Sequence, residues 1–266
     1  MVAIKESRME VLFGFFGALF ILIILPITIF LSPGYSPLTD VISLLGKEVH
    51  ARSLFSIGFV VAGSLFIPFY IYLKRELIYL EKENIRKLAT GVAIFTNMCV
   101  ALVGIIPDDT YPDAFLAFHA FVAGVAFIGS SIYIVLYSIL MYLGPKSTMH
   151  KGPEFKRYLA YYGFFIGVVL VVWLPNPTNS ILEWTLAILI LVWILITALQ
   201  CLSFKFSKLP GLYYKRSQYP EILKRFKEAL QVLDNVEMLD DPITEILKDN
   251  IKFIKSEMEK ESTKPS

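Results

Sequence analysis

Six long apolar runs restrict what this chain can fold into more than any other feature of its sequence. Each is close to or above the roughly 20 residues that an α-helix needs to cross the ~30 Å hydrocarbon core of a bilayer. Their only Asp, Glu, Lys, Arg or His side chains are His119 and Glu183. The fourth run is longer than a bilayer is thick, so its helix must tilt or protrude. The runs are residues 11–32, 53–73, 88–106, 114–143, 158–174 and 181–204.

The composition agrees with a membrane protein and excludes several other classes. Of the 266 residues, 56% are hydrophobic and 18% are charged, whereas a soluble chain is about 25% charged. A net charge of +2 and two cysteines argue against a nucleic-acid partner and against a disulfide scaffold. The runs are continuously apolar, without the alternation of barrel strands. We therefore predict an all-α polytopic membrane protein with six transmembrane helices.

The connections between the runs are alternately rich and poor in Lys and Arg. Residues 74–87 contain five of them and residues 144–157 contain four, and basic residues also flank the outermost runs. The connection at 33–52 has only Lys47 and Arg52, and the two remaining connections have none. Because Lys and Arg accumulate on the cytoplasmic side, we predict a multi-pass protein of the cell membrane with both termini in the cytoplasm.

We expect two parts, a transmembrane domain at 1–204 and a cytoplasmic helical tail at 205–266. The tail has 12 Lys or Arg and 11 Asp or Glu residues. Pro220 and Pro242 are each positioned to start an amphipathic helix. Two such helices bury their apolar stripes by pairing as a hairpin, or by docking on the loops or on a partner. A cytoplasmic protein partner for residues 220–260 and a solvated tail without one both stay open.

Titratable residues of the transmembrane domain gather toward the predicted external side. Asp108 and Asp109 follow the third run, His119 lies one to two turns into the fourth, and Glu183 begins the sixth. Charged groups at membrane depth are costly and mark functional sites. We predict an external pocket whose candidate catalytic residues are His119, Asp108 and Glu183. The candidate binding residues of the same pocket are Asp40, Ser43, Arg52 and Asp109.

Four of these residues also have an ordinary structural role open to them. Asp108 and Asp109 follow a proline and could form a solvated turn. Glu183 lies in a first helical turn, where a carboxylate is favourable with the helix dipole. His119 could simply donate a hydrogen bond to a backbone carbonyl.

Three short motifs carry a resemblance to a known family. They are Tyr35-Ser-Pro-Leu-Thr with Ile42-Ser43-Leu44-Leu45-Gly46, then Gly104-Ile-Ile-Pro107-Asp108 ahead of His119, and Glu183-Trp184. With them, residues 10–204 resemble the six-span membrane proteins of domain-of-unknown-function family 998. The chain is more distantly similar to damage-regulated autophagy modulator-like proteins. Leu44 replaces an acid usual in the family, with Asp40 as a candidate substitute, and Trp184 stands where Arg is frequent. The family has no established reaction, so the resemblance implies the architecture.

The pocket favours a protein that binds or remodels a lipid or other amphiphile at the outer leaflet. In a catalytic version, His119 would act as a base while Asp108 or Glu183 orients the imidazole or polarises water. Whether the protein is an enzyme stays open. The alternatives are a small-solute transporter, although no acid lies at mid-bilayer where coupling sites are found, and a non-catalytic scaffold that recruits partners through its tail.

We expect no metal and no other cofactor. Zinc prefers nitrogen and sulfur ligands at recognisable spacings, whereas a site here would combine His119 with carboxylates. A transmembrane haem requires paired axial histidines, and a retinal Schiff base requires a lysine inside a span. The six runs contain neither.

Overall fold

The structure is a computed structural model of the chain, and it describes residues 2–77, 82–106, 113–144, 155–207, 219–235 and 242–262. In these residues the regular structure consists of α-helices and one short 3₁₀ helix. The chain divides into two compact units, Met1–Leu202 and Ser203–Ser266. Each unit is described by itself below.

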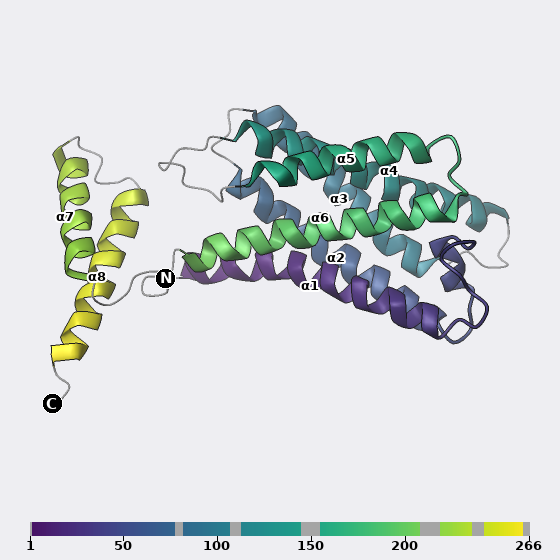
Figure 1. Cartoon of the computed structure of the whole chain (residues 1–266), viewed down its shortest axis with the longest axis horizontal. Helices are drawn as coiled ribbons and strands as arrows, with labels where there is room; N and C mark the ends of the chain where they lie inside the picture. Colours follow the sequence, from purple (N-terminus) through teal and green to yellow (C-terminus); the bar gives the residue numbers. More distant parts are fainter. Residues whose placement is uncertain are drawn as a thin grey trace. The chain divides into compact units, whose positions relative to one another are not determined.

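Six helices that lie alongside one another make up the first unit (Figure 1). The chain reverses direction between successive helices, so their N-termini alternate between the two ends of the bundle. The helices are α1 (Val2–Phe30), α2 (Arg52–Glu76), α3 (Glu83–Ile105), α4 (Asp113–Leu143), α5 (Arg157–Trp173) and α6 (Ser180–Ser207).

Among the described residues, five helices are long and apolar enough to cross a membrane. The five spans are Glu10–Phe30, Arg52–Glu76, Glu83–Ile105, Asp113–Leu143 and Ser180–Ser203. Helix α5 is apolar but has only 17 residues, which is about 25 Å at 1.5 Å per residue and short of a full span. The chain is thus an all-α polytopic membrane protein, as predicted, while the sixth span stays a prediction.

Helices that follow one another in the sequence pack closely from α1 through α5. Glycines at the contacts permit this, because small residues let two helix backbones approach each other. A Cβ added to Gly63 of α2 would lie 2.7 Å from the carbonyl oxygen of Asn97 in α3. A Cβ added to Gly163 of α5 would overlap the hydroxyl of Ser138 in α4.

Helix α6 is joined to α5 through two hydrogen bonds from aromatic side chains. The Tyr162 hydroxyl donates to the Leu189 carbonyl at 3.1 Å. The indole N–H of Trp193, which is fully buried, donates to the Leu159 carbonyl at 3.2 Å. Such bonds are favourable inside a membrane protein, where no water competes for the carbonyl groups.

The chain between α1 and α2 folds over one end of the bundle and contains the 3₁₀ helix η1 (Ile42–Gly46). We call residues 31–51 the η1 loop and this end of the bundle the η1 end. Helices α2, α4 and α6 begin at the η1 end, while α1, α3 and α5 end there. At the opposite end Arg75 of α2 forms an ion pair with Glu10 of α1.

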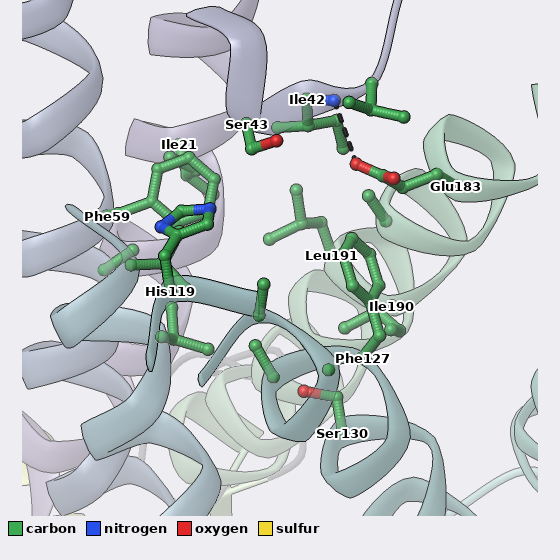
Figure 2. Close-up of a pocket in the computed structure, with 18 of the residues that line it drawn as sticks. Ile21, Ile42, Ser43, Phe59, His119, Phe127, Ser130, Glu183, Ile190 and Leu191 are labelled. Atoms are coloured by element: carbon green, nitrogen blue, oxygen red, sulfur yellow. Dashed lines mark hydrogen bonds between the residues drawn. The ribbon is translucent and has the colours of Figure 1, made fainter. Parts of the chain in front are cut away.

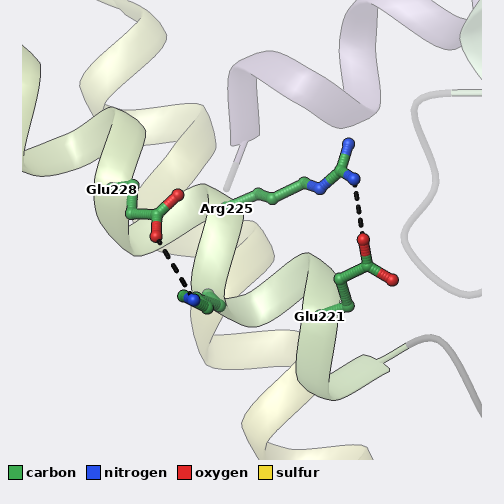
Figure 3. A network of polar contacts seen from close by, with 4 residues as sticks. Glu221, Arg225 and Glu228 are labelled. Atoms are coloured by element: carbon green, nitrogen blue, oxygen red, sulfur yellow. Dashed lines mark hydrogen bonds and ion pairs between the residues drawn. The ribbon is translucent and has the colours of Figure 1, made fainter.

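The second unit contains α7 (Tyr219–Asn235) and α8 (Pro242–Ser262), which pack against each other. Tyr219, Thr244 and Ile254 are its buried side chains among the described residues. The exposed side of α7 carries ion pairs one helical turn apart, Glu221 with Arg225 at 2.7 Å and Lys224 with Glu228 at 4.0 Å (Figure 3). Exposed pairs of this kind contribute only about 0.3–0.5 kcal/mol each.

Candidate functional site: a cavity beside the η1 loop

A cavity of about 440 Å³ lies inside the first unit. All six helices and the η1 loop contribute to its wall. Most of the lining side chains are apolar, and several are aromatic. The aromatic lining residues include Phe55, Phe59, Phe66, Phe127 and Trp173. The volume and the apolar wall are typical of a small-molecule site, for which about 300–1,000 Å³ is usual.

Polar side chains line the cavity at its η1 end. His119 of α4 and Glu183 of α6 lie on opposite sides of it, and Ile42 and Ser43 of η1 lie above both in Figure 2. His119 is 5% and Glu183 is 7% exposed. Two titratable groups are therefore held at the boundary between the cavity and the η1 loop.

Glu183 uses its carboxylate to hold the η1 loop. It does not cap α6, because Asn179 fills that role. The side-chain oxygen of Asn179 accepts a hydrogen bond from the Leu182 N–H at 3.0 Å. Oε1 of Glu183 accepts a hydrogen bond from the backbone N–H of Ile42 at 2.9 Å. The carboxylate therefore reaches across to another element, and a second oxygen remains as acceptor capacity.

His119 is oriented by a backbone carbonyl. Its Nδ1 lies 2.5 Å from the carbonyl oxygen of Ile106, and because a carbonyl only accepts, Nδ1 carries the proton. In the neutral imidazole Nε2 is then an acceptor, and this buried atom has no hydrogen-bond partner among the residues that the structure describes. The ordinary role expected for His119 is thus present, and it leaves an acceptor in the cavity wall.

The η1 loop is fastened to the first turns of α6 by a set of hydrogen bonds that we call the clasp. The indole N–H of Trp184 lies 3.1 Å from both the Tyr35 hydroxyl and the Asp40 carbonyl. The Ser180 hydroxyl donates to the Leu38 carbonyl at 2.9 Å. Burial raises the pKa of the Tyr35 phenol well above its ordinary value, so this hydroxyl stays protonated at neutral pH and remains a donor.

Comparison with protein families identifies the first unit. The family model described as "Protein of unknown function (DUF998)" matches residues 15–200, which is more than half of the chain. The chain belongs to the DUF998 family. The match runs from α1 to α6 and includes the η1 loop. Comparisons with curated proteins and with solved structures give no match. The similarity to damage-regulated autophagy modulator-like proteins stays a prediction.

The DUF998 domain brings together some of the residues that the sequence singles out. His119, Glu183 and Ser43 line one cavity although they come from three elements far apart in the chain. Asp108 and Asp109 lie outside the described residues, so their part in the pocket stays a prediction.

Two other predicted binding residues are not among those that line the cavity of the DUF998 domain. The carboxylate of Asp40 accepts a hydrogen bond from the backbone N–H of Ser36 at 2.8 Å, which stabilises the turn that follows α1. Arg52 is the first residue of α2, and its backbone N–H donates a hydrogen bond to the Glu48 carbonyl at 2.8 Å. Their contacts with a ligand stay predictions.

The far end of the cavity carries uncharged polar residues, which the distribution of charged residues in the sequence does not indicate. Asn97 of α3 and Ser130 and Tyr133 of α4 line it there, and all three are at least 97% buried. An amide inside an otherwise apolar run was the available signal, since such side chains hydrogen-bond across helices or hold ligands in membranes.

Metal ligands do not cluster in the part of the DUF998 protein that the structure describes. Among those residues, no group of three or more His, Cys, Asp or Glu side chains is placed to hold a metal ion. Both cysteines, Cys99 and Cys201, are buried. The expectation of no cofactor stays a prediction, because two of the acids in question lie outside the described residues.

Proposed function

We propose that this DUF998 protein binds an amphiphilic molecule in its internal cavity, with the polar group at the η1 end and the apolar chain among the aromatic side chains. The observation that carries the proposal is a largely apolar cavity with two buried titratable groups, His119 and Glu183, at one end. Its volume of about 440 Å³ lies in the lower half of the range for ligand pockets and favours one chain over a two-chain phospholipid.

The polar group of the ligand should carry hydrogen-bond donors. Nε2 of His119 is a buried acceptor that has no partner within the described part of the chain. The Glu183 side chain has acceptor capacity beyond its bond to Ile42. Hydroxyl and ammonium groups complement such a pair, whereas the acceptor oxygens of a phosphate or carboxylate would face acceptors. The proposed ligand class is therefore a single-chain alcohol or amine.

The polar end accounts for most of the expected selectivity. A hydrocarbon chain gains little when it moves from lipid into an apolar cavity, because lipid tails are equally apolar. A hydrogen bond in the low-dielectric interior of a protein is worth more than the same bond at the membrane surface. Substitutions at His119 and Glu183 should consequently affect binding more than substitutions among the phenylalanines.

We further propose that the η1 end faces outward from the cell membrane and that both termini are cytoplasmic. The distribution of Lys and Arg supports this orientation, since residues 74–87 and 144–157 connect helices at the opposite end. The cavity would then receive its ligand from the outer leaflet.

A cavity-filling substitution tests the proposal. A Cβ at Gly124, which lines the cavity, meets no atom within 4 Å, and the same is true of Gly91, which is exposed and does not line it. Protein purified in mild detergent would be extracted and its retained lipids measured by mass spectrometry. We expect Gly124→Leu to lower the retained amphiphile about tenfold or more, while Gly91→Leu keeps it, since a full side chain displaces the ligand atoms that would contact the wall.

Substitutions at the polar end provide the second arm of this test. We expect His119→Ala and Glu183→Gln each to lower retention about tenfold, the size expected for losing one hydrogen bond that involves a charged or strongly polar group. Elution volume in size-exclusion chromatography checks that each variant is folded. Equal retention in folded Gly124→Leu and wild-type protein, or a wild-type protein that retains no specific amphiphile, would contradict the proposal.

A further inference from the structure

Asn97 presents an unsatisfied acceptor to the cavity at its far end. Its side-chain N–H donates to the Ala93 carbonyl at 2.7 Å. Its Oδ1 is buried and accepts no hydrogen bond from the residues described in the structure, and the residue is only 1% exposed. The Asn97 side chain also interacts with the Tyr133 hydroxyl. Buried side-chain oxygens in native proteins are nearly always hydrogen-bonded, so Oδ1 has the capacity to accept a hydrogen bond from a ligand donor.

Two hydroxyl side chains line the same end of the cavity. Ser130 is 3% and Tyr133 is 1% exposed, and both belong to α4. Ser130 lies beside Phe127 at the side of the cavity away from Ile42 and Ser43 (Figure 2). Hydroxyl groups both donate and accept, so they can complete the hydrogen bonds of a ligand hydroxyl whose proton goes to an amide oxygen.

The two polar ends of the cavity are separated by a defined length. His119 and Ser130 are eleven residues apart on α4, which is three helical turns, the same helix face and a rise of about 16 Å. The wall between them includes Ala123 and Phe127, which are apolar. A ligand that reaches both ends has polar groups at the two ends of an apolar chain.

We propose that Asn97, Ser130 and Tyr133 form a second polar binding position, at which Asn97 accepts a hydrogen bond from a hydroxyl group at the far end of the ligand. The inference rests on the proposed function and narrows its ligand to a two-headed amphiphile whose polar groups lie about 16 Å apart. A neutral hydroxyl fits this position better than a charged group, because a charge without an ionic partner is strongly disfavoured in an apolar interior.

Paired probes test the second position in the full-length protein. Delipidated protein in detergent would be titrated with long-chain alkanediols carrying a hydroxyl at each end, and with mono-alcohols of the same chain length, and binding followed by native mass spectrometry. We expect the diol to bind about 3- to 10-fold more tightly, the effect of one added neutral hydrogen bond. The preference should be greatest for the chain length that spans the two polar ends.

Variants assign the preference to Asn97. Asn97→Leu removes the acceptor. In this variant the diol and the mono-alcohol should bind with about the same affinity, and mono-alcohol binding should persist. Thr96→Val is the matched control, because Thr96 is also fully buried but does not line the cavity. Its hydroxyl, like Oδ1 of Asn97, has no hydrogen-bond partner in the described part of the chain. It should keep the preference.

The outcomes separate this inference from the proposed function. If neither probe binds the wild-type protein, the proposed function fails. If the mono-alcohol binds and His119→Ala weakens it, but the diol has no advantage, only the second position is overturned. A preference retained in folded Asn97→Leu overturns it as well. Should Asn97→Leu not fold, the comparison of diol with mono-alcohol on the wild-type protein still decides.

Discussion

At the scale of single residues, Glu183 and Trp184 divide the attachment of the η1 loop between them. The Glu183 carboxylate accepts from the Ile42 N–H, while the Trp184 indole donates to Tyr35 and to the Asp40 carbonyl. One turn of α6 thus satisfies both a donor and acceptors of the loop. Asn179 caps the helix, which leaves Glu183 available for this role.

Gly163 offers a test of close packing at the same scale. A Cβ there would lie 2.9 Å from the Ser138 Cβ and would overlap its hydroxyl. We expect Gly163→Ala to lower the free energy of unfolding by about 1–3 kcal/mol, the range for overpacking a well-packed interior. Denaturant titration of the protein in detergent, followed by circular dichroism, measures the change.

Two further variants make the packing test specific. Ser138→Gly combined with Gly163→Ala should recover part of the lost stability, because it removes the overlapping atoms. Gly91→Ala should be neutral or slightly stabilising, since its Cβ meets nothing within 4 Å and alanine favours helix by about 0.5–1 kcal/mol over glycine. Equal stabilities of the Gly163→Ala and Gly91→Ala variants would refute the close contact.

At the scale of elements, the η1 loop and α6 act together as a cover on the cavity. The loop has its own backbone hydrogen bonds, such as Leu44 N–H to the Val41 carbonyl at 3.1 Å. Its position over the bundle depends on the clasp and on Glu183. The family match at 15–200 includes the loop and most of α6.

Removing the indole N–H of Trp184 should loosen the cover. Trp184→Phe loses the donor to Tyr35 and Asp40, both at 3.1 Å, which removes about 1 kcal/mol of local stability. Hydrogen exchange by mass spectrometry should show peptides from residues 35–46 exchanging about fivefold faster.

Trp173→Phe serves as the control for the clasp. The Trp173 indole N–H is buried and donates to no atom of the described residues, which include the whole η1 loop, so its loss removes no bond to the loop. Exchange in residues 35–46 should stay at the wild-type rate in this variant. Unchanged exchange in Trp184→Phe would show that the clasp does not hold the loop.

How far the sequence predicts the elements differs between helices and loop. The six apolar runs each correspond to a helix, because continuous apolar sequence in a membrane protein has only the helix as a way to satisfy its backbone. Pro242 begins α8, and α7 begins one residue before Pro220, as the proline positions predict. The docking of the η1 loop was not predictable, since it depends on hydrogen bonds between residues about 140 positions apart.

At the scale of the whole molecule, charge is distributed unequally between the ends of the six-helix unit. The connections opposite the η1 end contain most of its Lys and Arg residues, and this asymmetry orients a helical membrane protein during insertion. The orientation decides which leaflet of the membrane would supply the proposed ligand of this DUF998 protein.

Cysteine labelling in intact cells tests the orientation. We expect Thr39→Cys, in the η1 loop, to react with a membrane-impermeant thiol reagent in intact cells, because residue 39 is exposed and the proposed orientation places the loop outside. Asn84→Cys, an exposed and uncharged position near the start of α3, should react only after permeabilisation. Cys99 and Cys201 are buried and give the background in the unmodified chain. The reverse pattern would invert the orientation and with it the proposed source of the ligand.

The sequence by itself determined the class of the molecule, the approximate ends of its helices and the candidacy of His119 and Glu183. These follow from local properties: hydropathy over about twenty residues, prolines at helix starts, and the rarity of charge at membrane depth.

Only the tertiary structure decided which polar atoms share one space. It brought Ser43 to the same cavity as His119 and Glu183, used the Asp40 carboxylate within its own turn, and added Asn97 at the far end. The physical reason is that a helix side chain faces lipid, a neighbouring helix or a cavity according to the packing of all six helices. That packing depends on contacts between residues far apart in the chain, which no local pattern specifies.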